Sequence, residues 1–324
     1  MTAHRITVLG ESVADAFVEP PHAAADGLTL RVQAGGGPAN TAVALARLGT
    51  PTRFLGRFSD DVFGRLFRER LASAGVDLTH SVRAAEPSTL AVAELSPHGE
   101  AAYSFHAEAA ADWQWDPAEL AGVPLTDTDC VHTGSLALVR EPGAAAVEEF
   151  LARAVDRATV SIDPNVRPLL VAPARYRDRL ARWCALADVL RLSADDLAVL
   201  LPGTSPEQAC DQWHRAGVRL VVVTLGADGA LASLDGVRIT VPALRVEVAD
   251  TVGAGDAFTA GLLHHLGAAG LLGGRLDSLT TAAVEAACGY AARVAALTCA
   301  VPGADPPRAG ELPPTRTAPA GTAN

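Results

Sequence analysis

The sequence predicts an α/β protein in which a mainly parallel sheet is covered by helices on both faces. Short runs rich in β-branched residues alternate with Ala-, Leu- and Arg-rich segments through most of the 324 residues, and this alternation is typical of such sheets. A content of 49% hydrophobic and 19% charged residues suits a globular chain. The length allows one large domain or two smaller ones.

The expected strands of the sheet are short and apolar, and they cover residues 5–9, 53–58, 129–133, 158–163, 188–192 and 219–225. The expected helices carry apolar residues three and four positions apart. They cover residues 38–48, 63–74, 143–157, 173–186, 256–266 and 281–297. Pro38 just inside the first helix and Gly49 just after it match the usual signals for a helix start and end.

Two segments break the alternation and look extended: residues 28–34, and residues 88–108 with a turn at 97–100. They indicate a small second sheet that closes over a site, although an extra edge hairpin fits the pattern equally well. We therefore expect one domain over residues 1–303 with lid segments at about 11–34 and 88–112. Residues 304–324 are rich in Pro, Ala, Gly and Thr, which predicts a disordered tail.

The charge pattern, the N-terminal residues and the cysteines indicate which partners and which cellular location to expect. A net charge of -11 and no Lys/Arg-rich block argue against binding to nucleic acid or to an anionic membrane. The N-terminal residues lack the apolar core of a signal peptide, and no apolar run is long enough for a membrane span. The five cysteines form no C-x-x-C pair, so we expect reduced thiols in a cytoplasmic protein.

The stretch 250-DTVGAGD-256 predicts a site for an anion. Gly253 and Gly255 leave their backbone amides uncovered, and a helix that begins at this turn directs its positive end to the same place. The amides from Gly253 through Ala254 and Gly255 to Asp256 then form an anion hole. Asp256 can accept a proton from a hydroxyl during phosphoryl transfer, and we expect the helix end to lower its proton affinity. A capped helix after a glycine turn is the plain alternative.

The longer string 250-DTVGAGDAFTAGLL-263 resembles the C-terminal signature of the ribokinase-like, or PfkB, sugar kinases. The stretch 35-GGGPANTA-42, with Gly49 seven residues on, resembles the N-terminal signature of the same family. One residue departs from the pattern: in 56-GRFSDDVFG-64, Ser59 stands where the family usually has a glycine. The resemblance implies a ribokinase-like three-layer sandwich with a small β-sheet lid. It also implies ATP and Mg²⁺ as cofactors, a K⁺ site near Asp250, and a homodimer formed through the lid.

The resemblance also implies a role for individual residues. Asn40 and Arg167 have side chains suited to sugar hydroxyls or to an anion, and Asp196 replaces the usual glutamate of a magnesium-ordering motif with a shorter carboxylate. An Asp-rich helix start explains Asp196 equally well. The implied sugar-binding residues are Asp15, Gly36, Gly37, Asn40 and Arg167, and the implied nucleotide-binding residues are Ser193, Thr224, Gly226, Gly229 and Gly255.

The substrate expected from the resemblance is fructose, with transfer of the γ-phosphoryl group to a primary hydroxyl. A 2-keto-3-deoxygluconate kinase is the near alternative, but the lid arginine typical of that enzyme is replaced here by His106. Another sugar or nucleoside kinase of the family stays open. From other classes, a nicotinamide dehydrogenase lacks its G-x-G-x-x-G in 10-GESVAD-15, and an inactive sugar-binding regulator would not need Asp256 and the Gly-Ala-Gly turn.

Overall fold

An eight-stranded sheet forms the centre of the protein in a computed structural model that describes residues 5–19, 27–95 and 101–312. Six neighbouring strands are parallel, and the last two continue the sheet as antiparallel strands. In spatial order the strands are β4 (Thr52–Leu55), β1 (Ile6–Leu9), β9 (Cys130–Gly134), β10 (Thr159–Asp163), β11 (Val189–Ser193), β12 (Leu220–Thr224), β13 (Ala230–Leu234) and β14 (Val237–Val241). The predicted, mainly parallel sheet is confirmed.

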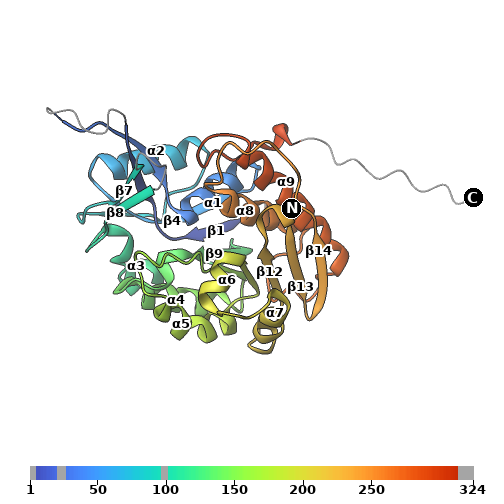
Figure 1. Cartoon of the computed structure of the whole chain (residues 1–324). Coiled ribbons are helices and arrows are strands. Elements are labelled where there is room, and N and C mark those ends of the chain that lie inside the picture. Colours follow the sequence, from blue (N-terminus) through green and yellow to red (C-terminus); the bar gives the residue numbers. More distant parts are fainter. Residues whose placement is uncertain (1–4, 20–26, 96–100, 313–324) are drawn as a thin grey trace, which may run out of the picture.

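Helices cover both faces of this sheet and make three layers (Figure 1). One face packs against α1 (Gly37–Arg47), α2 (Val62–Ser73), α8 (Ala254–Ala268) and α9 (Thr281–Cys299). The other face carries α3 (Pro117–Ala121), α4 (Gly143–Ala154), α5 (Pro173–Leu186), α6 (Ala194–Leu200) and α7 (Pro206–Arg215). Strand β12 shows the alternation that this requires: Leu220 and Val222 enter one core, whereas Val221 and Val223 enter the other.

A separate four-stranded sheet lies beside the central one, where β7 and β8 are labelled in Figure 1. Its spatial order is β3 (Leu30–Gly35), β2 (Val13–Val18), β7 (Thr89–Leu95) and β8 (Ala101–His106). Strands β7 and β8 are antiparallel, as expected for the hairpin, and its turn at 97–100 lies outside the described residues. Strand β2 places Asp15 opposite Gln33 of β3, so a small mixed sheet is present as the sequence indicated.

The expected strand over residues 53–58 is in fact two strands that belong to different sheets. Strand β4 ends at Leu55, and β5 (Arg57–Ser59) pairs with β6 (Val82–Ala84) instead of continuing beside β1. The chain turns at Gly56, whose carbonyl accepts a hydrogen bond of 2.9 Å from the Val82 amide. A Cβ atom there would come within 2.5 Å of the Phe54 ring, so the turn brings the backbone close to that side chain.

The described chain continues past residue 303 and packs against the domain as far as Leu312. Arg47 pairs with Asp305 and donates to the Pro306 carbonyl at 2.7 Å, and Arg70 donates to the Ala304 carbonyl at 2.9 Å. The segment expected to be a tail from residue 304 is therefore held to α1 and α2 in its first part. Residues 313–324 lie outside the described residues. Within the described part of the chain, no helix is long and apolar enough to cross a membrane.

Candidate functional site

A cavity of about 770 Å³ lies at the carboxyl edge of the central sheet. Residues that follow or end the parallel strands form one side of it, among them Glu11, Asn165 and Thr224. The small sheet supplies another side through Val13 and Asp15 of β2 and through residues of β7 and β8. Ligands of open α/β sheets bind at this edge, so the cavity is the candidate site.

Most of the residues predicted for the site line this one cavity, although they come from distant parts of the sequence. The predicted residues in its lining are Asp15, Gly36, Gly37, Asn40, Arg167, Ser193, Asp196, Thr224, Gly226, Gly253, Gly255 and Asp256. Ala254, Gly229 and Asp250 are not part of the lining. Both sequence signatures therefore meet at a single site.

Asp15 and the glycines of the first signature are closely packed. A Cβ atom on Gly35 would lie 2.0 Å from Oδ2 of Asp15, and one on Gly37 would lie 2.6 Å from Nδ2 of Asn165. Burial raises the pKa of Asp15 to about 6, while the positive charges of Arg70 and Arg167 act in the opposite direction. Glycine at these positions lets polar side chains lie directly against the backbone.

The amide of Asn40, in the first turn of α1, is already engaged at both ends. Its Nδ2 donates to Oδ2 of Asp256 at 2.9 Å, and its Oδ1 accepts from Nη1 of Arg70 at 2.9 Å. These two partners fix which end of the amide carries nitrogen. The sequence suggested that Asn40 serves sugar hydroxyls as donor and acceptor, but in this structure it connects Arg70 to Asp256.

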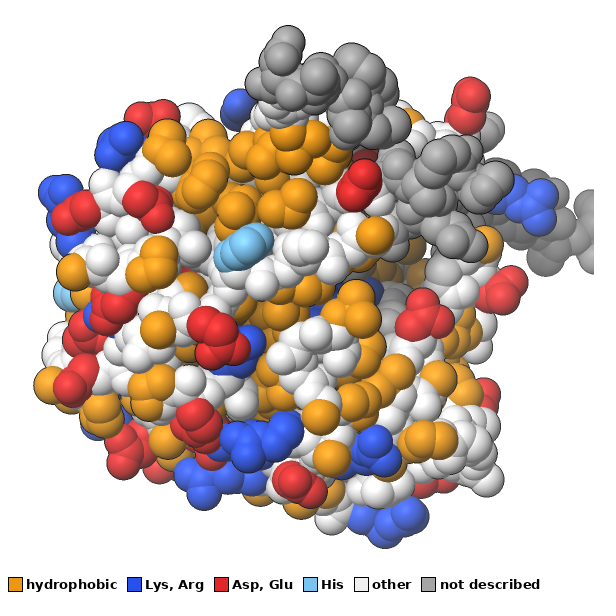
Figure 2. Space-filling model, turned by 60° about the vertical axis from the view of Figure 1, so that its left-hand side comes forward, with side chains coloured by type: hydrophobic (Ala, Val, Ile, Leu, Met, Phe, Trp, Pro, Cys, Tyr) orange, Lys and Arg blue, Asp and Glu red, His pale blue; other side chains and the backbone are white. Residues whose placement is uncertain are grey.

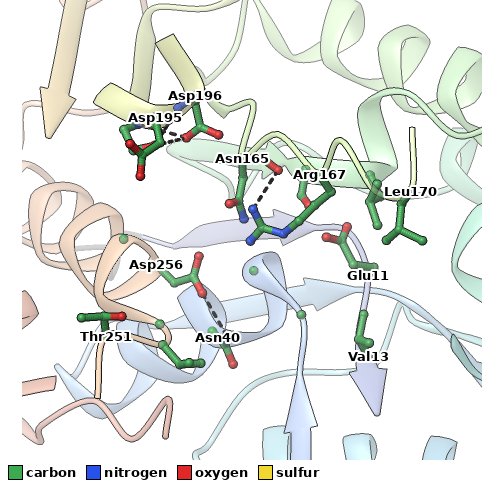
Figure 3. A pocket seen from close by; sticks show the side chains of 18 of the residues that line it. Glu11, Val13, Asn40, Asn165, Arg167, Leu170, Asp195, Asp196, Thr251 and Asp256 are labelled. Carbon is green, nitrogen blue, oxygen red and sulfur yellow. Dashed lines mark hydrogen bonds between the residues drawn. The ribbon is translucent and has the colours of Figure 1, made fainter. Parts of the chain in front are cut away.

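Asp256 lies in the first turn of α8, at the place where the chain enters the helix from the glycine turn (Figure 3). Gly253 precedes the helix with a φ of 75°, a left-handed conformation that favours glycine. Burial of the carboxyl group raises the pKa of Asp256 to about 6; the hydrogen bond from Asn40 opposes this shift and the charge of Asp163 adds to it. The raised pKa is opposite in direction to the expectation that the helix end would lower the proton affinity of Asp256, and burial is its main cause.

Arg191 supplies a positive charge beneath the glycine turn, and the motifs did not reveal it. Its guanidinium donates to Oδ2 of Asp163 at 2.7 Å and to the hydroxyl of Thr224 at 2.7 Å. A Cβ atom on Gly255 would lie only 2.8 Å from Nη1 of Arg191. Arginine on a strand of the central sheet, in 191-RLS-193, was the only sequence signal.

Ser193 and Asp196 form a capping box at the start of α6. The Ser193 hydroxyl accepts from the Asp196 amide at 3.0 Å, and Oδ2 of Asp196 accepts from the Ser193 amide at 3.1 Å. Oδ1 of Asp196 accepts from the Val166 amide at 2.7 Å. The carboxylate therefore holds two backbone segments together, and the exposed Asp195 beside it also lines the cavity.

Gly229, predicted to bind nucleotide, and Asp250, predicted to bind a cation, both contact other parts of the protein backbone. A Cβ atom on Gly229 would lie 2.1 Å from the Val241 carbonyl, so Gly229 permits close contact with β14. Asp250 accepts from the Val252 amide at 3.0 Å and from the Gly303 amide at 2.8 Å, and so ties the glycine turn to the C-terminal segment. Among the described residues, no group of three or more His, Cys, Asp or Glu side chains could hold a metal ion by itself.

On the small sheet, alternate side chains of β8 face the cavity. Tyr103 and Phe105 line it and stack with their ring centroids 5.9 Å apart. His106 is exposed and is not part of the lining, and its correspondence to the lid arginine of a 2-keto-3-deoxygluconate kinase stays a prediction. Arg167 is exposed and lies in the cavity, where its Nη1 donates to the Val166 carbonyl at 3.2 Å.

Comparison with known families gives a match over nearly the whole chain. The family described as "pfkB family carbohydrate kinase" matches residues 3–309. A fructokinase of Klebsiella pneumoniae is 38% identical over 275 residues, which cover 82% of this chain and 86% of that protein. A fructokinase of Rhizobium leguminosarum bv. trifolii is 35% identical over 249 residues, which cover 76% and 73% of the two chains.

Solved structures agree with these matches. A Xylella fastidiosa fructokinase with bound ATP has a TM-score of 0.82 at 30% identity, with 93% of each chain covered. A Vibrio cholerae fructokinase with fructose, ADP and a calcium ion has a TM-score of 0.80 at 29% identity, with 94% of this chain and 95% of that chain covered. A double mutant of the V. cholerae protein was solved with fructose, ADP and a potassium ion. An aminoimidazole riboside kinase of Salmonella enterica has a TM-score of 0.77 at 27% identity, with 93% and 95% covered.

Proposed function

Because this chain belongs to the pfkB family of carbohydrate kinases, we propose that it transfers the γ-phosphoryl group of ATP to a primary hydroxyl of fructose. The observation that carries the proposal is the position of Asp256. Its carboxyl group lies in the first turn of α8, bonded to Asn40, in a cavity that both sequence signatures line. The names of the similar proteins support fructose as the sugar.

We assign the sugar to the part of the cavity beside the small sheet. Asp15 and Arg167 offer polar contacts there, and Gly36 and Gly37 are part of the same lining. Tyr103 and Phe105 supply aromatic surface that a sugar ring can pack on. Asn40 contributes mainly by orienting Asp256, since both ends of its amide have protein partners.

Asp256 accepts the proton of the attacking hydroxyl in this mechanism. A carboxylate whose pKa is about 6 is mostly ionised at neutral pH, and it is still basic enough to take a proton as the bond to phosphorus forms. The backbone amides of Gly253, Gly255 and Asp256, at the positive end of α8, stabilise the negative charge on the group in transfer. The amide of Ala254 already donates to the Thr251 carbonyl at 3.2 Å, so it contributes only through the helix end. Arg191 adds positive charge below this turn.

We place ATP beside Ser193, Thr224 and Gly226, with its terminal phosphate at the glycine turn next to Gly255. Gly229 shapes the same loop from behind through its contact with β14. Mg²⁺ usually keeps several waters and takes one or two carboxylates in addition to phosphate oxygens. Asp195 is exposed at the start of α6, where it could meet such waters, and this fits the donor set of the site. Asp196 lies beside it, but its two oxygens already accept from the Val166 and Ser193 amides. Asp250 is our candidate for a K⁺ site, supported by the potassium bound to the V. cholerae double mutant.

A homodimer formed through the small sheet is also part of the proposal. Figure 2 shows hydrophobic side chains gathered on the side of the molecule where β7 and β8 lie. Leu28, Leu30 and Tyr103 are large hydrophobic residues in this region that are 38–56% exposed. Burial of such side chains against a second copy would remove apolar surface from water. Sedimentation analysis of the chain, compared with a Leu28→Ser variant, tests this part.

An ADP-release assay across a panel of acceptors tests the proposed function. The panel contains fructose, glucose, ribose, 2-keto-3-deoxygluconate and purine nucleosides, each measured with and without Mg²⁺. We expect the highest kcat/KM with fructose and none without Mg²⁺. Turnover of the keto acid alone would replace fructose by a sugar acid as the substrate. Sugar binding without any ADP release would favour the inactive regulator instead.

A further inference from the structure

Glu11 is a buried acidic residue in the cavity that neither sequence signature contains. It follows β1, and it is 2% exposed although it belongs to the cavity lining. The Ser135 side chain hydrogen-bonds its carboxyl group. Its Oε2 atom has no hydrogen-bond partner within the described part of the chain. A buried acceptor without a partner destabilises a protein, so this atom needs an explanation.

The charged groups around Glu11 do not supply the missing partner. Asp112, a second buried carboxylate, already accepts from the Ser12 amide at 2.9 Å and from the Thr89 hydroxyl at 2.7 Å. Arg167 is close enough to affect the proton affinity of Glu11, but its guanidinium donates to carbonyls of its own loop at 3.2 and 3.4 Å. Tyr176, the other titratable group nearby, has its hydroxyl bonded to the Arg167 amide at 3.2 Å.

The position of Glu11 relates it to the sugar rather than to the nucleotide. In Figure 3, Glu11 and Asp256 lie on opposite sides of the cavity, and the Arg167 side chain lies between them. Arg167 acts on the proton affinities of Glu11, Asp15 and Asp256 alike. The three carboxyl groups are thus grouped around Arg167 in the part of the cavity that we assign to the sugar, whereas we assign the nucleotide to Ser193, Thr224 and Gly226 of the same lining.

We propose that Glu11 is a further substrate-binding residue, whose Oε2 accepts a hydrogen bond from a sugar hydroxyl remote from the hydroxyl that is phosphorylated. This inference rests on the proposed function, because it takes a sugar as the ligand. A hydroxyl is the suitable partner, since it can donate to the free oxygen and bring no charge of its own. Burial raises the pKa of Glu11 to about 7, and Arg167 opposes this shift, so a bound donor would favour the ionised form.

The test compares wild type with Glu11→Gln, which keeps the size of the side chain, and with Glu11→Leu, which removes the acceptor. Loss of a hydrogen bond to a charged group costs about 1.5–3 kcal/mol, or roughly 10- to 150-fold in affinity. We expect Glu11→Leu to raise KM for fructose by a factor in this range and Glu11→Gln by less, with KM for ATP unchanged. Unchanged KM for fructose in both variants would overturn the inference.

Fructose analogues that each lack one hydroxyl separate binding from a merely structural effect. For the analogue without the hydroxyl that Glu11 contacts, wild type and Glu11→Leu should have nearly equal kcat/KM, while the other analogues keep the full difference. Asp112→Asn is the matched control, because its oxygens have protein partners; its effect should be the same for every analogue. The same uniform effect for Glu11→Leu would overturn the inference.

Calorimetric titration with fructose distinguishes this inference from the proposed function. A wild-type protein that binds fructose but releases no ADP rejects the kinase function, and the affinities of the Glu11 variants still decide the role of Glu11. A wild-type protein that turns fructose over, with both variants binding fructose as tightly as wild type, rejects the role of Glu11 alone. Absence of any sugar binding by wild type rejects both.

Discussion

Two of the helices that begin at the cavity, α6 and α8, each carry an aspartate at the third position of the first turn. In α6 this residue is Asp196, and the residue before the helix is Ser193, so a capping box forms and occupies the carboxylate. In α8 it is Asp256, and the preceding residue is Gly253, which has no side chain to cap the helix. Asp256 therefore bonds to Asn40 at the cavity. The comparison shows that the capping residue decides whether such a carboxylate is available for chemistry.

The largest effect should come from Asp256→Asn. If the free carboxylate of α8 accepts the proton, its loss should lower kcat by about 10²- to 10⁴-fold. Binding of fructose should change little, because an amide keeps the shape and one oxygen. Steady-state kinetics gives kcat, and calorimetry gives the affinity for the sugar. If the variant keeps more than a tenth of wild-type kcat, the aspartate of α8 is no more important for catalysis than that of α6.

Gly37→Ala should have the next largest effect. The added Cβ would lie 2.6 Å from Nδ2 of Asn165 and 3.2 Å from Oδ1 of Asp256, so one of these side chains must move. A displacement of about 1 Å in an active site can cost about 100-fold in rate, and we expect a fall of that order in kcat/KM for fructose. Gly122→Ala is the control, since no atom lies within 4 Å of its Cβ position. Equal activity of the two variants would contradict the tight packing at Asp256.

The pH dependence should distinguish Asp256 from an exposed aspartate. Its folded pKa is raised to about 6, and only the ionised carboxylate accepts a proton. We therefore expect kcat/KM to fall as the pH drops through about 6, by at least about tenfold for each further unit, because Asp15 titrates in the same range. A pH series of initial rates with saturating MgATP measures this. A profile that is flat down to pH 5 would mean that Asp256 titrates like an unburied group.

Asp196→Asn should affect stability more than catalysis. The carboxylate holds the Val166 amide and caps α6, and loss of such bonds should lower the free energy of unfolding by about 1–3 kcal/mol. We expect kcat at saturating Mg²⁺ to fall less than about tenfold. Chemical denaturation measures the free energy of unfolding. The control is Asp195→Asn, at the exposed neighbouring residue. A collapse of kcat at unchanged stability would place Asp196 with Asp256 instead.

The sequence predicted the long, strongly patterned elements and the two signatures, because these depend on local residue spacing. Short elements were missed, including β14 and α7, although Ser205, Pro206 and Gln208 form a readable helix start. Ser193 and Asp196 form another readable helix start, which agrees with the Asp-rich helix start given as the alternative to metal binding at Asp196.

Glu11, Arg191 and the raised pKa of Asp256 could not be predicted from local spacing. Each depends on burial against segments that are distant in the sequence. The two-strand break at Gly56 has the same origin, since β5 finds its partner in β6. Local patterns specify the order of the helices and strands. They do not specify which polar atoms remain without partners once the chain is folded.

Arg70 connects the cavity to segments that lie outside it. It lies on α2, is not part of the cavity lining, and bonds to Asn40, to the Ala34 carbonyl of β3 and to the Ala304 carbonyl. The same Asn40 amide donates to Asp256. Arg70 thus helps to hold the Asn40 amide in the orientation that meets Asp256, and the C-terminal segment helps to hold Arg70 in place. A substitution at Arg70 or in the segment around Ala304 therefore acts on the hydrogen bond to Asp256 without changing any residue that lines the cavity.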